Sequence, residues 1–499
     1  MNEENTHSHT TDNDATYDHI VKYTGLFGGV QGVNLLINII RNKVTACFLG
    51  SAGVGLINVY NKTIGLVGQA TNLGISFSAV KHVAELSETT DTAQRDKLID
   101  TVRMWCLMTA ALGILVGASL SPWISWWAFK NYDYALAFSV LSLVVAMTTI
   151  TAGEIAILKG LKQLKKVAII SIFAALATLI VCVPFYYFFG INGVTSALVT
   201  SNAAILGLHL YYTSKVAPWR KSIATFKAIK RGIPMAKLGI AYILAGIIGQ
   251  GAEFFISTFI LKHGSLEYVG LYNTGFLLVT YIGSLLFTAV EADFFPRLSA
   301  LSHDTRRMNK AINQQIEVCI LLISPCLILE VIAMPLIIRI LYTTQFAQAG
   351  PMATFAIFYL FFKAMTLPVA YLALAKGDSR TFLIAELLYG IFVAMAVPFA
   401  FLRYGLIGTG IALSLASLFD LMLIYIFYST KFGFRLALQP IRMYVAQFLL
   451  LGGCVYASTL SCSLSKWGIS LLALLLSGLL SLYQLREKTN LIPRFRQSK

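Results

Sequence analysis

The sequence predicts an all-α membrane protein that crosses the bilayer about fourteen times and is built from two related halves. Three observations support this prediction. First, the 499 residues are 57% apolar and only 12% charged, with a mean hydropathy of +0.72, whereas a soluble domain carries roughly 25% charged residues. Second, apolar stretches long enough to span a bilayer follow one another along the chain. Third, one stretch in the first half recurs in the second half without a gap.

Apolar stretches of about 20 residues or more extend from near residue 22 to residue 485. We expect helices at 22–47, 53–86, 99–124, 132–158, 163–188, 191–214, 236–262, 267–299, 310–340, 350–376, 380–402, 407–430, 439–459 and 466–485. The longest connection, at about 215–236, is too short for an extramembrane domain. The polar first 20 residues predict a disordered tail, and we interpret its three histidines, His7, His9 and His19, as solvated side chains.

A repeat of 37 residues identifies the two halves. Residues 54–90, VGLINVYNKTIGLVGQATNLGISFSAVKHVAELSETT, match residues 269–305 at an offset of 215, with eight identical positions. Two of the identities pair Gly55 with Gly270 and Asn58 with Asn273. Because six expected helices separate the copies, both halves run in the same direction, related by an axis along the membrane normal. This symmetry is typical of transporters, whose substrate site lies between the repeats.

The repeat and the loop charges predict the domains and their orientation. We expect an acidic tail at 1–20, a first lobe at 21–214, a basic linker at 215–236, a second lobe at 237–432, and two further helices with a basic tail at 433–499. With the N-terminus in the cytoplasm, the inner loops, tails and flanks hold about 30 of the 39 Lys and Arg residues. Both termini are therefore predicted to be cytoplasmic. The basic linker forms either a helix on the inner membrane surface or a plain loop.

Three of the basic residues inside expected helices are candidates for binding an anionic substrate group, because a charge there costs about 2.5–3.5 kcal/mol even on the least severe scale. Arg41 lies toward the outer end of the first helix, Lys62 about two turns into the second, and Lys363 in the middle of the tenth. The repeat counterpart of Lys62 is Leu277, so the fold alone requires no cation there. Cations on three helices can converge on an anionic group. For Arg41, snorkelling to the lipid headgroups is the alternative.

Acidic and amide side chains inside expected helices form a second set of candidates. Buried acids can bind Na⁺ or H⁺ and couple transport to a gradient, or they can form salt bridges or face a water-filled vestibule. The candidates for ion coupling are Glu154, Glu253, Glu291, Asp293, Glu330 and Asp420. The amides expected to line a polar cavity, or else to form ordinary interhelical hydrogen bonds, are Gln31, Asn34, Asn38, Asn58 and Gln250.

The sequence contains no motif of soluble-enzyme chemistry. It has no Walker loop, no dinucleotide-binding glycine fingerprint followed by an acid, and no H-E-x-x-H. We therefore expect no catalytic residue, no metal site and no cofactor other than a coupling Na⁺ or H⁺. The net charge of +16 is explained by membrane topology, so no nucleic-acid partner is expected. Transport would then be driven by an ion gradient, the membrane potential or downhill flux.

Residues 25–86, GLFGGVQGVNLLINIIRNKVTACFLGSAGVGLINVYNKTIGLVGQATNLGISFSAVKHVAEL, resemble the N-terminal region of bacterial polysaccharide-export flippases. These belong to the multidrug/oligosaccharidyl-lipid/polysaccharide (MOP) exporter superfamily. The resemblance is clearest over about residues 20–300 and rests on helix spacing, glycines and a charged exit after the second helix. It implies two six-helix lobes around a cationic cavity, as in Wzx-type flippases, and Arg41 and Lys62 match positions where such relatives place cavity cations.

The resemblance implies that an undecaprenyl-pyrophosphate-linked oligosaccharide, such as an O-antigen unit, moves from the inner to the outer leaflet of the bacterial inner membrane. The implied partners are this lipid-linked glycan, membrane lipids and other polysaccharide-assembly proteins. One alternative is a multidrug and cation antiporter of the same superfamily, which should have an acidic cavity. Another is a membrane-embedded polymerase or ligase, which should have a larger outer loop than the roughly 15 residues available here.

Overall fold

The computed structural model describes the backbone of residues 7–87, 92–219, 226–301, 304–460 and 462–488. Within these ranges, side chains are described except at residues 7–29, 31, 77, 81, 85, 87, 226–242, 282, 285, 286, 288–293, 296, 300, 463, 487 and 488. The described residues form helices joined by short turns and contain no strand. The predicted all-α class is confirmed.

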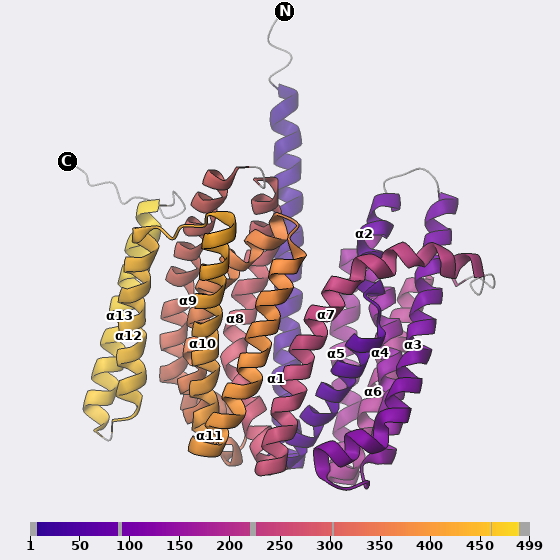
Figure 1. Cartoon of the computed structure of the whole chain (residues 1–499), viewed down its shortest axis with the longest axis horizontal. Coiled ribbons are helices and arrows are strands. Elements are labelled where there is room, and N and C mark those ends of the chain that lie inside the picture. Colours follow the sequence, from indigo (N-terminus) through magenta and orange to yellow (C-terminus); the bar gives the residue numbers. More distant parts are fainter. Residues whose placement is uncertain (1–6, 88–91, 220–225, 302–303, 461, 489–499) are drawn as a thin grey trace, which may run out of the picture. The chain divides into compact units, whose positions relative to one another are not determined.

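Thirteen α-helices and two 3₁₀ turns follow one another in the described residues (Figure 1). Their bounds are α1 His7–Thr71, α2 Ile75–Ser87, α3 Thr92–Phe129, α4 Ala135–Gly160, α5 Leu164–Phe189, η1 Gly190–Gly193, α6 Val194–Ser214, α7 Phe226–His263, α8 Leu266–Ala300, α9 Thr305–Leu341, η2 Thr344–Phe346, α10 Ala349–Ala375, α11 Ser379–Phe432, α12 Leu438–Ser458 and α13 Ser463–Lys488.

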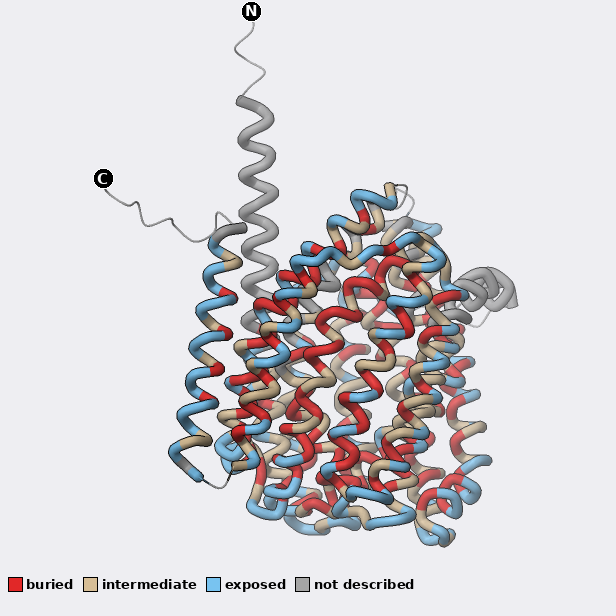
Figure 2. Tube along the Cα trace, turned by 60° about the vertical axis from the view of Figure 1, so that its left-hand side comes forward, coloured by how far each residue is buried: buried red, intermediate tan, exposed pale blue. Residues whose placement is uncertain are grey.

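Ten helical segments of the described residues are long and apolar enough to cross a membrane, fewer than the fourteen expected. Three segments each contain two expected helices joined at a glycine, which accounts for three of the four, and the helix expected at 267–299, which corresponds to α8, is not among the ten. The segments at 32–71, 164–214 and 379–432 have 40, 51 and 54 residues, but about 20 residues span a bilayer core. Their breaks fall at Gly50, Gly190 and Gly405, which all have positive φ angles. Figure 2 shows buried and exposed residues alternating along the helices, as expected where one side contacts other helices.

The sequence repeat extends to the helix boundaries at the same offset of 215. Shifted by 215 residues, α4 covers 350–375 and α5 covers 379–404, which match α10 and the first part of α11. The turns agree as well. Gly190 (φ 53°) corresponds to Gly405 (φ 59°), and Lys162 (φ 56°) corresponds to Gly377 (φ 73°). The two halves of the chain therefore share one backbone plan, although few of their residues are identical.

The described residues fall into two compact units. The first contains those within 1–49 and 63–243, and the second those within 50–62 and 244–499. The boundary falls inside α1, because the residues just after its kink at Gly50 pack with the second unit. The predicted limits of the two lobes stay predictions.

In the first unit, α3 and α4 approach closely along a row of small residues. A methyl group added at Gly117 would lie 2.8 Å from the Cβ of Ser142, and one added at Gly153 would lie 2.4 Å from the Sγ of Cys106. Small residues allow close backbone approach, which drives helix association in membranes because lipid is as apolar as leucine. The sequence of α3 and α4 thus specifies a tight helix pair.

In the second unit, hydroxyl groups of α11 bind backbone carbonyls of α10. Ser414 Oγ donates to the Phe355 carbonyl at 2.7 Å, and Ser417 Oγ donates to the Tyr359 carbonyl at 2.9 Å. Such interhelical hydrogen bonds contribute about 1 kcal/mol or less each. These hydrogen bonds hold α11 against α10, the helix that contains Tyr359 and Lys363.

The final two helices lie outside the repeat and pack together and against α9 (Figure 1). Gln447 of α12 is 1% exposed, and its amide accepts a hydrogen bond from Ser477 Oγ at 2.6 Å and donates one to Ser481 Oγ at 3.1 Å. Both serines belong to α13. A buried polar cluster that satisfies itself in this way specifies one pairing of two otherwise apolar helices.

The repeated glycines meet each other inside the second unit. A methyl group added at Gly55 would lie 1.9 Å from the Leu266 carbonyl oxygen, and one added at Gly270 would lie 2.0 Å from the Ser51 carbonyl oxygen. A Cβ atom added to either glycine would also lie 3.1 Å from the backbone nitrogen of the other. The second part of α1 therefore crosses α8 at equivalent residues of the two repeats.

Replacing a crossing glycine should destabilise the protein. We expect Gly55→Ala to lower the free energy of unfolding by about 1–3 kcal/mol, because backbone atoms must move apart to admit the methyl group. Gly452→Ala in α12 is the control, since no atom lies within 4 Å of its added Cβ, and it should change stability by less than about 1 kcal/mol. Thermal unfolding of the purified variants tests this, and equal melting temperatures would contradict it.

Asp378 is the N-cap residue of α11, and its carboxylate also pairs with Lys431 near the other end of this kinked helix. Its carboxylate accepts hydrogen bonds from the Thr381 backbone nitrogen at 3.2 Å and hydroxyl at 2.7 Å, and it lies 2.5 Å from the Lys431 Nζ. The Lys431 ammonium and then the Thr381 hydroxyl lower the pKa of Asp378 to about 2. An N-cap of this type stabilises a helix by about 1 kcal/mol.

The lowered pKa of Asp378 predicts a pH-dependent contribution to stability. Because the folded pKa lies below the unfolded value, the contribution is complete above about pH 4 and is lost as the pH falls toward 2. We expect Asp378→Asn to lower the melting temperature by a constant amount from pH 8 to about pH 4, and by less at lower pH. A difference that grows as the pH falls would show that the charge is not stabilising.

Candidate functional site

A pocket of about 120 Å³ lies entirely within the second unit. Five helical segments contribute side chains to it: the second part of α1, then α7, α8, α10 and α11. Its polar and aromatic lining consists of Asn58, Lys62, Glu253, Ser257, Tyr272, Asn273, Phe276, Tyr359, Glu386 and Tyr389. Polar groups are thus gathered at one place in helices that are otherwise apolar.

Equivalent residues of the two repeats line this pocket. Asn58 and Asn273 each lie three residues after a crossing glycine, on the segments that meet at Gly55 and Gly270. Asn58 is 4% exposed, and its side-chain nitrogen has no hydrogen-bond partner among the described residues. Asn58 was predicted as a cavity amide from its place in an apolar helix, whereas Asn273 was noted only as its repeat partner.

Lys62 forms an ion pair with Glu253 of α7, and both residues line the pocket. The lysine side chain is 25% exposed and the glutamate side chain 42%. The sequence predicted Lys62 for an anionic substrate group and Glu253 for ion coupling. The structure brings the two together, so either role requires the ion pair to open. Both roles stay predictions.

Lys363 forms a second ion pair, with Asp420 of α11, at 2.7 Å. The aspartate side chain is only 5% exposed. The Lys363 ammonium also lies 4.5 Å from the centre of the Tyr389 ring, and Tyr389 lines the pocket. Lys363 is therefore held beside the pocket by one carboxylate and one aromatic face.

Glu386 of α11 lines the pocket and was not among the predicted residues. No salt bridge joins it to a basic residue of the described chain, although it interacts electrostatically with Lys363 and Asp420. The sequence did carry a signal for it, since Glu386 is the only acid within the expected helix 380–402. The pocket tyrosines carried no such signal, because aromatic residues occur throughout the helices.

Arg41 belongs to the first unit and has different neighbours. It lies within electrostatic range of Cys182 and Tyr186 of α5, and no carboxylate of the described residues pairs with it. About two turns earlier, Asn34 Nδ2 donates to Ser171 Oγ of α5 at 2.9 Å. The first part of α1 thus forms a polar contact with α5, and Arg41 is a cation without an ionic partner there.

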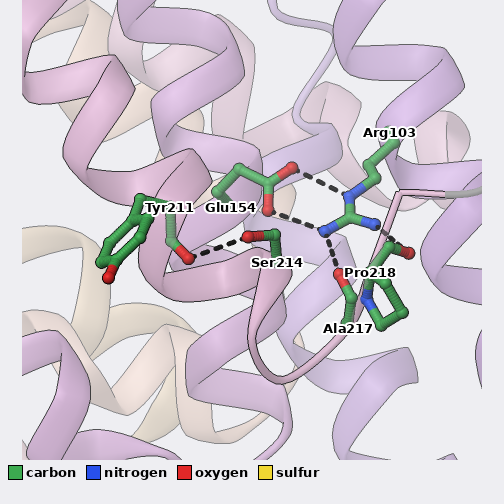
Figure 3. A network of polar contacts seen from close by, with 6 residues as sticks. All are labelled: Arg103, Glu154, Tyr211, Ser214, Ala217 and Pro218. Carbon is green, nitrogen blue, oxygen red and sulfur yellow. Dashed lines mark hydrogen bonds and ion pairs between the residues drawn. The ribbon is translucent and has the colours of Figure 1, made fainter.

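Glu154 is part of a buried network at the end of the first unit (Figure 3). Its carboxylate accepts hydrogen bonds from Arg103 Nε at 2.9 Å and Nη2 at 3.1 Å, and both side chains are 1% exposed. The same guanidinium donates to the carbonyls of Ala217 and Pro218, at 2.8 and 3.2 Å, and lies 4.7 Å from the centre of the Trp219 ring.

The Arg103 network gives Glu154 a structural partner and fixes the chain that leaves α6. An equivalent contact occurs in the second unit, where Asn313 of α9 donates to the Arg435 carbonyl at 2.9 Å and accepts from the Ala437 backbone nitrogen at 2.7 Å. In each unit, the third helix of that half (α3 or α9) therefore binds the segment that follows the sixth helix of the same half (α6 or the second part of α11). The predicted coupling role of Glu154 stays a prediction.

Of the remaining predicted residues, those whose side chains are described do not line the pocket. Glu330 of α9 is 3% exposed, and one of its oxygens has no hydrogen-bond partner among the described residues. Asn38 and Gln250 are partly exposed. The side chains of Gln31, Glu291 and Asp293, like those of His7, His9 and His19, lie outside the described residues.

Removing one partner of the Arg103–Glu154 pair should strongly destabilise the protein. We expect Glu154→Ala to lower the free energy of unfolding by about 3–5 kcal/mol, because it leaves a buried, unpaired charge. The double variant Arg103→Met, Glu154→Leu should recover at least half of that loss, since no charge remains buried. Thermal unfolding measures both variants. A double variant less stable than Glu154→Ala would show that the carbonyl contacts dominate.

Several solved structures of transporters and of a flippase have a fold similar to that of this chain. An inward-facing multidrug resistance MATE family transporter of the MOP superfamily superposes with a TM-score of 0.62 and 13% identity, covering 80% of this chain and 96% of that chain. The inward closed structure of the lipid II flippase MurJ gives 0.61 and 14%, covering 92% and 99%. A MOP superfamily transporter from Pyrococcus furiosus, described as having a binding pocket of reverse polarity, gives 0.55 and 13%, covering 82% and 93%.

These likenesses establish that the protein has the fold of the MOP superfamily and confirm a multi-pass membrane protein. Residues 44–351 match the model of the family described as polysaccharide biosynthesis protein. Because the match covers more than half of the chain, the protein belongs to this family. The resemblance seen in the sequence is thereby confirmed. A search of curated protein sequences finds no match to the chain.

Proposed function

We propose that the protein is a flippase that moves a lipid-linked oligosaccharide from the inner to the outer leaflet of the bacterial inner membrane. The carrier lipid would be undecaprenyl pyrophosphate, and the glycan an O-antigen or a related surface-polysaccharide unit. Membership of the polysaccharide biosynthesis protein family supports this proposal, as does the MOP superfamily fold. The observation that carries it is a polar pocket built by membrane-spanning helices around equivalent residues of the repeat.

Such a pocket addresses the main physical obstacle to the reaction. A sugar pyrophosphate loses its hydration when it enters hydrocarbon, and an unpaired charge there is very costly. Amides, carboxylates and cations held inside the protein replace the lost water. Alternating access, by rocking of the two repeat halves, would expose these groups to one side of the membrane at a time while the lipid tail stays in the bilayer. No catalytic residue is needed.

Among the three predicted cations, Arg41 is the best candidate for the pyrophosphate. Its guanidinium can donate two parallel hydrogen bonds to a phosphate group, and no carboxylate of the described residues competes for it. Lys62 and Lys363 are held by Glu253 and Asp420, so they would have to exchange partners to bind an anion. A carboxylate released in this way is where we propose that a coupling H⁺ or Na⁺ binds.

We further propose that both termini lie in the cytoplasm, as the distribution of Lys and Arg predicts. The cytoplasmic side is also where lipid-linked glycans would be delivered to the protein by other polysaccharide-assembly proteins.

One observation favours a second candidate, a cation antiporter of the same superfamily. The pocket is lined by one lysine but two glutamates, with three tyrosines and a phenylalanine around them. Carboxylates and aromatic faces also bind organic cations. The flippase remains the better-supported function because the family match concerns polysaccharide biosynthesis.

The deciding experiment measures lipid-linked glycan in each leaflet after deletion of the gene. A flippase predicts that intermediates accumulate in the cytoplasmic leaflet while surface glycan falls. Normal surface glycan combined with sensitivity to cationic dyes would instead establish the antiporter.

Arg41→Gln tests the proposed pyrophosphate contact in the same assay. Losing a charge-assisted contact of about 1.5–3 kcal/mol should reduce glycan export by about tenfold to a hundredfold at normal protein levels. Arg403→Gln is the matched control, because Arg403 is an exposed arginine of α11 that contacts the Phe399 ring and no pocket residue. Equal export by the two variants would exclude Arg41 from substrate binding.

A further inference from the structure

We propose that the pocket of the second unit binds one uncharged sugar ring of the lipid-linked glycan, and that it does not bind the pyrophosphate. This inference rests on the proposed function, and it assigns a specific part of the substrate to a specific set of residues. Four features of the pocket support it: its charge, its aromatic wall, its unpaired polar groups and its size.

The charge of the pocket disfavours an anion. Of its lining residues, Lys62 is the only cation, and it is paired with Glu253. Glu386 adds a second carboxylate that no basic residue of the described chain neutralises by a salt bridge. A phosphate would therefore have to separate an ion pair and then lie near two carboxylates. Separating a partly buried pair leaves one charge without its partner, which is strongly unfavourable.

The same charges suit sugar hydroxyl groups. A hydroxyl both donates and accepts hydrogen bonds, so it can donate to a carboxylate such as Glu386 without any change in the Lys62–Glu253 pair. Hydrogen bonds to charged groups are stronger than those between neutral groups. A neutral polyol thus uses the pocket as it stands, whereas an anion must rearrange it.

An aromatic wall forms one part of the pocket. The rings of Tyr272 and Phe276 are parallel within 3°, with centres 6.4 Å apart, and Phe276 meets Tyr359 edge to face at 5.5 Å. All three residues line the pocket, as does Tyr389. Aromatic faces provide large apolar contacts with little loss of conformational freedom. The C–H face of a sugar ring is the complementary surface, because the hydroxyl groups then point away from the wall.

Asn58 contributes a further polar side chain to the pocket lining. It is 96% buried, lines the pocket, and its amide nitrogen has no acceptor among the described residues. An unsatisfied buried donor is unfavourable. Because this nitrogen is fully buried, it can donate to a sugar hydroxyl only after the Asn58 side chain turns toward the pocket, and Glu386 would accept a hydrogen bond from another hydroxyl. Together the two residues would supply one donor and one acceptor, the two capacities of a hydroxyl group.

The size of the pocket limits the ligand to about one ring. Its volume of about 120 Å³ lies well below the roughly 300–1,000 Å³ of pockets that enclose drug-sized ligands. An oligosaccharide cannot enter as a whole, so the pocket would select one residue of the glycan and leave the others outside.

Direct binding of neutral sugars to the full-length protein in lipid nanodiscs tests the proposal. The probes are glucose, galactose, mannose and N-acetylglucosamine, and saturation-transfer NMR reports contact between each sugar and the protein. We expect at least one of them to bind in the millimolar range, and we expect inorganic pyrophosphate at the same concentration not to displace it. Displacement by pyrophosphate, or no contact with any of the four sugars, would overturn the proposal.

Two pocket variants and one control locate the binding. Glu386→Gln keeps the size of the side chain and should weaken sugar binding at least tenfold. Asn58→Leu replaces an unpartnered amide by an apolar group of similar shape, so it should weaken sugar binding similarly while leaving the melting temperature unchanged or raised. Tyr456→Ala, in an exposed residue of α12, should change neither quantity. Sugar binding unaffected by both pocket variants would place the sugar elsewhere and overturn the proposal.

The tests separate this inference from the proposed function. If tetraphenylphosphonium binds the pocket, loses affinity in Glu386→Gln, and no sugar binds, the pocket is a cation site and the inference is wrong. The leaflet assay after gene deletion would still decide whether the protein moves a lipid-linked glycan. A protein that traps glycan in the cytoplasmic leaflet but shows no sugar contact at this pocket would keep the flippase function and lose the sugar site.

Discussion

A charge inside a membrane-spanning helix is costly unless it has a partner, and this constraint shapes both units. Three ion pairs meet it: Arg103 with Glu154, Lys62 with Glu253, and Lys363 with Asp420. Each pair joins two different helices, so satisfying a charge also determines which helices are neighbours. An unpaired charge in hydrocarbon is costly. Ion pairing therefore helps to determine which helices pack together, because apolar contacts alone discriminate poorly between partner helices.

The two halves share a backbone plan but use it differently. Gly55 and Gly270 allow equivalent helices to cross in close contact, and Asn58 and Asn273 then face the same pocket. The charges do not follow the symmetry, since the counterpart of Lys62 is Leu277. A repeated backbone thus supplies the position of the pocket, and substitutions in one copy supply its chemistry.

Pairing also changes how the basic residues should be interpreted. Counting cations in the apolar helices suggests a cavity ready for an anion, but two of the three are held by carboxylates within the second unit. Arg41, in the first unit, is left as the cation without an ionic partner among the described residues.

The sequence by itself determined the helical class, the approximate positions of the spans and the offset of the repeat, because hydropathy, span length and glycine positions are properties of short stretches. It also showed that Lys62, Glu253, Lys363 and Asp420 each needed a partner. Only the tertiary structure decided the pairing, since 191 residues separate Lys62 from Glu253 and 57 separate Lys363 from Asp420. The cost of burying a charge is local, but the identity of its partner depends on how distant helices pack.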